Sequence, residues 1–154
     1  MSRAFVREVD DAPAPPMPER PISAAPNLVT PEGAALIAAE LAAIDAALAE
    51  GAGDTETLLR DQRYWSARQA SMQVVETPDD PEAVCFGARV NIRRRGKTVS
   101  LVIVGEDEAD PAEGLIAWTS PLARALDGAE PGEEIDFEAG GQPETIAILG
   151  IAKR

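Results

Sequence analysis

The chain has 154 residues, enough for one compact domain with an appendage. Its 27 acidic and 14 basic residues give a formal net charge of −13. A chain of this charge is repelled by nucleic acids and anionic lipids, so direct binding of DNA, RNA or a membrane is excluded as its main activity. A basic protein surface or a metal ion is a better partner for it.

The sequence contains no histidine and a single cysteine, Cys85. The commonest general base and the commonest zinc ligand are therefore missing, and no internal disulfide can form. We expect a monomer that is not an enzyme and has no cofactor of its own. Because the N-terminal segment lacks a signal-peptide core and no apolar run reaches about 20 residues, we also expect a cytoplasmic protein.

Residues 1–28 are rich in proline. Proline removes a backbone donor and restricts the residue before it, so neither a helix nor a central strand can form in such a segment. The sequence therefore predicts a disordered, Pro-rich tail, punctuated by Pro13, Pro15, Pro16, Pro18, Pro21 and Pro26.

Residues 29–76 are predicted to form an antiparallel helical hairpin. Thr30 and Pro31 are typical of a helix start, and the glycines of residues 51–53 are typical of a helix end. Asp54 or Thr55 then caps a second helix that runs to about residue 75. A heptad stripe predicts coiled-coil packing of the first arm: Ala34, Ile37, Leu41, Ile44 and Leu48.

The two predicted arms differ in charge. The first arm is purely acidic, whereas the second carries Arg60, Arg63 and Arg68. This difference predicts cross-helix ion pairs that favour antiparallel docking, although each exposed pair is weak.

Residues 82–154 are predicted to form an α+β domain. Strands at 84–92 and 98–104 flank a turn at 93–96, and a third short strand covers 115–119. A helix opens at Ser120, and a last strand pair follows on either side of two glycines. This order indicates one helix against a mostly antiparallel sheet.

Five collinear strings resemble the Gre family of transcription elongation factors (GreA/GreB). They are Val29-Thr-Pro-Glu-Gly33, Tyr64-Trp-Ser-Ala-Arg68, Phe86-Gly-Ala-Arg-Val90, Ile103-Val-Gly-Glu-Asp-Glu-Ala-Asp110 and Ser120-Pro-Leu-Ala-Arg-Ala-Leu126. The resemblance implies an N-terminal helical hairpin and a C-terminal domain with an FKBP-like fold. It also implies binding to bacterial RNA polymerase at its secondary channel, where the domain grips the rim and the hairpin projects inward.

The resemblance implies a rim contact through Thr119, Ser120, Pro121 and Arg124. DNA and RNA would then be reached only through the polymerase, and no membrane contact is expected. Taken from the residues alone, the same helix start is an ordinary capped helix with a solvent-facing arginine.

In the family, an acidic hairpin tip helps to hold a second Mg²⁺ at the polymerase active site and promotes transcript cleavage. This chain departs from that pattern, because its arms are shorter and Thr57 and Arg60 stand at the offset from Tyr64 where the family has an acidic pair. Asp54 and Glu56 lie at the bend and are the substitute candidates for the magnesium, which would be shared with the polymerase. An N-cap and a first-turn acid explain the same two residues.

Two other functions stay open. One is a polymerase binder without cleavage activity that competes with cleavage factors, as in the branch of the nucleoside diphosphate kinase regulator (Rnk). The other is an FKBP-like peptidyl-prolyl isomerase, which needs a deep aromatic pocket, whereas the few aromatics of this domain are required for its own core: Phe86, Trp118 and Phe137.

Overall fold

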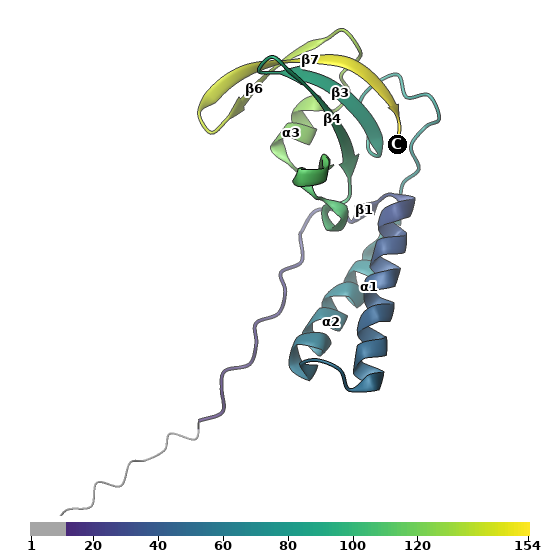
Figure 1. Ribbon diagram of the computed structural model, residues 1–154, viewed down its shortest axis with the longest axis vertical. Coiled ribbons are helices and arrows are strands. Elements are labelled where there is room, and N and C mark those ends of the chain that lie inside the picture. The colour runs from purple at the N-terminus through teal and green to yellow at the C-terminus, as the bar shows by residue number, and fades with distance from the viewer. Residues whose placement is uncertain (1–11) are drawn as a thin grey trace, which may run out of the picture.

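The computed structural model describes residues 12–154, which form a helical hairpin projecting from a curled sheet domain (Figure 1). The hairpin consists of α1 (Pro31–Glu50) and α2 (Thr55–Ser71). Thr30 caps α1 by accepting a hydrogen bond from the Gly33 amide at 3.0 Å. The predicted helical hairpin is confirmed, and it extends away from the domain.

The second arm ends four residues earlier than predicted. Met72 is extended, and the two residues after it form the short strand β2 (Gln73–Val74). This strand pairs in parallel with β1 (Leu28–Val29), which comes just before the start of α1. The paired strands close the base of the hairpin, and this pairing overrides the helical periodicity of the sequence.

The hairpin core is small. Ile37, Ile44 and Trp65 are buried between the arms together with Val29. Ala34, Leu41 and Leu48 are partly buried against them, so the apolar stripe predicted for the first arm does face the second. The coiled-coil character stays a prediction.

The predicted cross-helix ion pairs are wrong. Among the described residues, the three arginines of α2 find their acids elsewhere: Arg60 pairs with Asp61, Arg63 with Glu19, and Arg68 with Asp107. The polar contact that does cross the hairpin joins Gln62 to Asp45. Charge composition showed which arm was basic, but the acids that pair with these arginines lie in the same arm or outside the hairpin.

The second domain is a five-stranded sheet in the order β5-β4-β3-β7-β6. β5 runs parallel to β4, and the other neighbours are antiparallel. The predicted α+β class and element order are confirmed. The elements are β3 (Ala88–Arg94), β4 (Lys97–Val104), the 3-10 turns η1 (Glu106–Glu108) and η2 (Pro111–Glu113), β5 (Leu115–Ala117), α3 (Pro121–Leu126), β6 (Glu134–Ala139) and β7 (Gln142–Lys153).

The first strand of the sheet domain, β3, begins at Ala88 and not at Val84 as predicted. Gly87 has a φ of +82°, which turns the chain just before the strand. Val84 instead hydrogen-bonds to Ala129, and its side chain is buried. The apolar pattern therefore marked a core residue correctly but assigned it to the wrong element.

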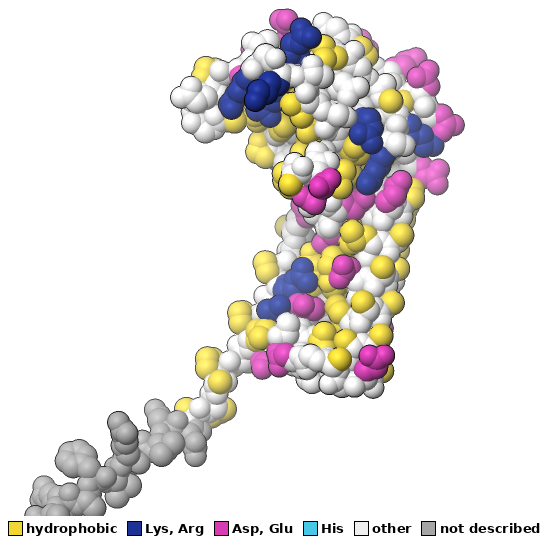
Figure 2. Space-filling model, in the orientation of Figure 1, with side chains coloured by type: hydrophobic (Ala, Val, Ile, Leu, Met, Phe, Trp, Pro, Cys, Tyr) yellow, Lys and Arg dark blue, Asp and Glu magenta, His cyan; other side chains and the backbone are white. Residues whose placement is uncertain are grey.

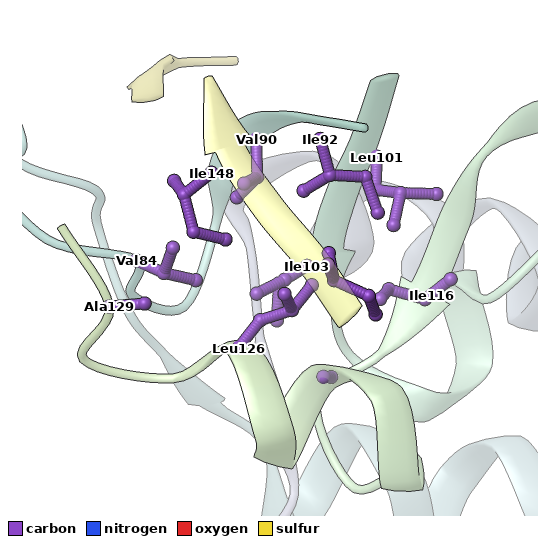
Figure 3. Close-up of a cluster of buried hydrophobic side chains, with 11 residues drawn as sticks. Val84, Val90, Ile92, Leu101, Ile103, Ile116, Leu126, Ala129 and Ile148 are labelled. Atoms are coloured by element: carbon purple, nitrogen blue, oxygen red, sulfur yellow. The ribbon is translucent and has the colours of Figure 1, made fainter. Parts of the chain in front are cut away.

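The domain core lies between the concave face of the sheet and α3 (Figure 3). Ile92 and Ile146 come from the sheet and Leu126 from the helix, and all three side chains are fully buried. The helix is thereby fixed against the strands. An FKBP-like relationship for this domain stays a prediction.

The predicted segment limits of 1–28, 29–76 and 82–154 stay predictions, and residues 1–11 lie outside the described residues. Between residues 12 and 154, no helix has the length and apolar character needed to cross a bilayer.

Candidate functional site

A buried polar cluster, here called the joint, fastens the helical hairpin to the sheet domain. Arg68 of α2 is 2% exposed and donates from Nε to Asp107 Oδ2 at 2.6 Å. Its Nη2 donates to Asn27 Oδ1 at 2.7 Å, and the Tyr64 hydroxyl donates to the other oxygen of Asp107. A buried ion pair stabilises a fold only when its remaining donors and acceptors are also satisfied, and here they largely are.

A second buried carboxylate, that of Glu108, completes the joint. It accepts hydrogen bonds from the Thr30 hydroxyl at 2.7 Å and from Arg154 Nη1 at 3.1 Å. The Thr30 hydroxyl thus both caps α1 and contacts the sheet domain through Glu108. The approach depends on Gly33, where an added Cβ would lie 2.4 Å from Glu108 Oε2. The glycine is therefore required by close packing and not by its backbone angles.

Three of the five strings singled out in the sequence meet at the joint. Residues 29–33 supply Thr30 and Gly33, residues 64–68 supply Tyr64 and Arg68, and residues 103–110 supply the acids of η1. Sequence reasoning missed this contact. The signal that could have predicted this contact was a set of strings, far apart in the chain, that combine glycine, threonine and charged residues.

The predicted rim residues surround the start of α3. Ser120 is the N-cap and accepts from the Ala123 amide at 3.3 Å, while Pro121 occupies the first turn. Ser120 and Pro121 also line an open, mainly apolar groove of about 510 Å³, whose other walls come from β5 and from the β6–β7 turn. Thr119 precedes the cap and is half-buried.

Arg124 faces a different hollow, a pocket of about 320 Å³ that Phe86 and Trp118 also line. The indole N–H of Trp118 is buried and has no hydrogen-bond partner among the described residues. Arg124 is exposed, and within residues 12–154 no carboxylate lies at ion-pair distance from its guanidinium. The predicted set therefore divides between two depressions that α3 helps to line, and its arginine is available to a partner.

At the hairpin tip, Asp54 is the N-cap of α2. Its Oδ2 accepts from the Thr57 amide at 3.0 Å, and hydrogen bonds from the Thr57 hydroxyl and amide lower the pKa of the Asp54 carboxyl. Glu56 is exposed in the first turn and accepts from the Met17 amide at 3.1 Å. The two candidate metal ligands lie in one turn, but one oxygen of Asp54 is already engaged by the helix.

Within the described part of the chain, no group of three or more acidic or cysteine side chains is arranged to hold a metal ion. Mg²⁺ prefers octahedral oxygen ligands and usually keeps several waters, so two tip carboxylates could supply only part of its shell. A metal at the tip would need further ligands from a partner.

An extended stretch of the proline-rich segment, residues 17–23, lies along α2. Glu19 pairs with Arg63 at 2.6 Å, and the Arg20 guanidinium stacks 3.8 Å from the centre of the Tyr64 ring. Stacking of this kind is a favourable cation–π contact. Residues 12–27 contain no helix or strand, so this contact depends on side chains.

One end of this stretch contacts the start of α2, and the other end contacts η1. Met17 reaches Glu56 near the tip, whereas the Ser23 hydroxyl donates to Glu106 beside the joint at 3.0 Å. The stretch therefore covers one side of α2 over most of its length. The sequence indicated only that this segment would lack regular structure.

Comparison with known proteins decides the family. The family model "Transcription elongation factor, GreA/GreB, C-term" matches residues 78–153. The transcription elongation factor GreB of Xanthomonas axonopodis pv. citri is 34% identical over 150 residues, covering 80% of this chain and 89% of the relative. The chain belongs to the GreA/GreB family.

A second relative is matched over less of its length, whereas two solved structures are covered almost completely. The GreA of Desulfovibrio desulfuricans is 34% identical over 58% of this chain, and the chain spans 57% of that protein. Among solved structures, the GreA/GreB factor of Nitrosomonas europaea has a TM-score of 0.41 at 22% identity, covering 83% of this chain and 98% of that one. Gfh1 of Thermus thermophilus has a TM-score of 0.40 at 15% identity, with 80% and 97% covered.

The joint predicts a large stability difference between two arginines of α2. In Arg68→Ala, Asp107 keeps its burial but loses its cation, so we expect a loss of about 3–5 kcal/mol in the free energy of unfolding, measured by urea denaturation. Arg63→Ala is the matched control, because its ion pair with Glu19 is exposed, and it should barely change stability. Similar small effects of both substitutions would contradict a structural role for the joint.

The single tyrosine of the chain, Tyr64, gives a direct readout of the joint. Burial first, and then the hydrogen bond to Asp107, raise its pKa from 10.0 to about 12. We expect ultraviolet absorbance titration to give a midpoint near 12, falling part of the way toward 10 in Asp107→Asn.

The raised pKa of Tyr64 makes the free energy of unfolding depend on pH. The folded protein favours the neutral phenol, so the contribution of Tyr64 is complete below pH 10 and is lost as the pH rises toward 12. Tyr64→Phe should remove this component from a stability-versus-pH curve. An unshifted midpoint near 10 would show that the phenol is not held by Asp107.

Proposed function

We propose that this Gre family member binds bacterial RNA polymerase at its secondary channel and modulates elongation, as a cytoplasmic interaction protein and not as an enzyme. Family membership supports the polymerase as partner. The observation that carries the proposal is the helical hairpin, which projects from the sheet domain and is fixed to it by a buried joint. A rod fixed in this way can be inserted into a pore while its base stays outside.

The proposed rim contact is the face around the start of α3. Its apolar groove at Ser120 and Pro121 can receive aliphatic side chains, and the exposed Arg124 beside it can pair with a carboxylate of the partner. Apolar contact with a neighbouring charge is the usual composition of a specific protein interface. The capped start of α3 presents these residues on a fixed helix.

The length of the rod limits what the tip can reach. α1 has 20 residues, which corresponds to about 30 Å at 1.5 Å per residue. The tip carboxylates are few, and one oxygen of Asp54 is engaged as a helix cap. These two observations favour the second candidate function, a Rnk-like binder that occupies the channel without stimulating cleavage and competes with cleavage factors.

Binding can be tested by co-purification with core polymerase. We expect Arg124→Glu combined with Pro121→Ala to reduce the affinity at least about tenfold, because one charge is reversed and one wall of the groove is lost. Lys153→Glu on β7 is the charge-matched control and should bind normally. Undiminished binding of the double variant would remove this face as the contact.

Cleavage can be tested in backtracked elongation complexes, alone and in competition with an authentic cleavage factor. The informative variant is Asp54→Asn with Glu56→Gln, since asparagine remains a good N-cap while both charges are lost. If the tip holds Mg²⁺, transcript shortening should depend on these carboxylates. If the protein is a competitor, the wild type and the variant should inhibit the authentic factor equally, and neither should shorten the transcript.

A further inference from the structure

The turn between β3 and β4 is a basic region on an acidic protein. Five of the 14 basic residues lie between positions 89 and 97, although the whole chain has a net charge of −13. Figure 2 shows one group of dark-blue side chains at the end of the sheet domain that lies away from the helical hairpin. The name arginine turn is used below for residues 93–97.

The backbone of the arginine turn adds an independent observation. Arg94 pairs with Lys97 across a two-residue connection in which Arg95 has a φ of 50° and Gly96 a φ of 72°. Turns of this kind favour asparagine, aspartate or glycine at both positions, because a side chain is strained at positive φ. Arg95 is the single described non-glycine residue with positive φ. An arginine here makes the turn worse, so the contacts of its side chain, and not the turn geometry, explain its presence.

The side chains of the arginine turn are partly arranged and partly free. Glu144, which is only 7% exposed, binds the guanidinium of Arg94 and accepts from Arg95 Nε at 2.7 Å, leaving the Arg95 side chain 62% exposed. Arg93 and Lys97 are exposed, and no described carboxylate lies within ion-pair distance of either. The turn therefore presents two cations without a carboxylate partner, Arg93 and Lys97, beside two arginines that Glu144 holds in place.

The surroundings of the turn indicate the class of partner. The adjoining face of β3 and β4 exposes Asn91, Thr98 and Ser100, and residues 88–100 contain no aromatic side chain. Protein interfaces are centred on aromatic and aliphatic anchors, and the exposed side chains of β3 and β4 include neither kind. Arginine and lysine together with serine, threonine and asparagine are the residues that contact phosphate and sugar.

We propose that the arginine turn, which stays outside the channel with the sheet domain, contacts the phosphate backbone of nucleic acid on the outer surface of the transcribing polymerase. This inference rests on the proposed function, because the net charge of the chain opposes binding to free nucleic acid. At physiological salt, charges more than about 8 Å away are largely screened, so the distant acidic residues do not cancel a local contact. Docking on the polymerase supplies the effective concentration that a weak contact needs.

The test compares two forms of the polymerase, the core enzyme alone and an elongation complex assembled on a labelled nucleic-acid scaffold. The variant is Arg93→Ser with Arg95→Asn and Lys97→Thr. Because asparagine suits the positive φ of position 95, this variant should fold at least as well as the wild type. Glu144→Gln is a control that changes the charge in the opposite direction, since it removes the carboxylate that pairs with Arg94 and Arg95.

We expect the wild type to bind the elongation complex more tightly than the core enzyme, and the triple variant to lose only that difference. The slope of log affinity against log salt for the elongation complex should fall by about 2–3, or about 1 for each lost phosphate contact. Glu144→Gln should bind the elongation complex at least as tightly as the wild type. A photo-crosslinker at Thr98 should label nucleic acid.

Two outcomes would overturn the proposal. Equal loss of binding to both forms, with crosslinking to a polymerase subunit, would assign the arginine turn to an acidic protein surface. Unchanged binding of the triple variant would leave the turn without a contact. Failure of the wild type to bind either form is a different result, because it would reject the proposed function itself.

Discussion

The buried contact of Arg68 with Asp107 is the interaction on which the architecture depends. It joins the last turn of α2 to a 3-10 turn of another domain, and Tyr64 and Asn27 complete its hydrogen bonds. A charged pair removed from water has strong directional requirements, so it is satisfied in one relative orientation of the two domains. An apolar contact of similar area would allow the hairpin to slide.

The acidic residues of this protein therefore do two different things. Asp107 and Glu108 are buried and bind the two domains together, whereas Asp54 caps a helix at the far end of the hairpin. At these positions each carboxylate contributes by accepting hydrogen bonds from particular partners. The net charge of −13 by itself says nothing about this division of roles.

The surfaces assigned to partners lie on separate parts of the molecule. The face around the start of α3 combines an apolar groove with the free arginine Arg124, and the arginine turn combines cations with polar side chains. The helical hairpin extends from the other end of the sheet domain (Figure 1). A factor built in this way can meet a large assembly at several points only because the joint keeps these parts in one arrangement.

Most of the elements could be predicted from the sequence, because helix caps, glycine turns and apolar periodicity act over a few residues: Thr30, Gly51, Ser120 and the alternating strands were all readable. It also indicated the family through its collinear strings. The pairing of charges could not be predicted in the same way, since Arg68 finds a partner 39 positions away and Glu19 finds Arg63 across 44. Such contacts depend on how domains meet in space, and local propensity carries no information about that distance.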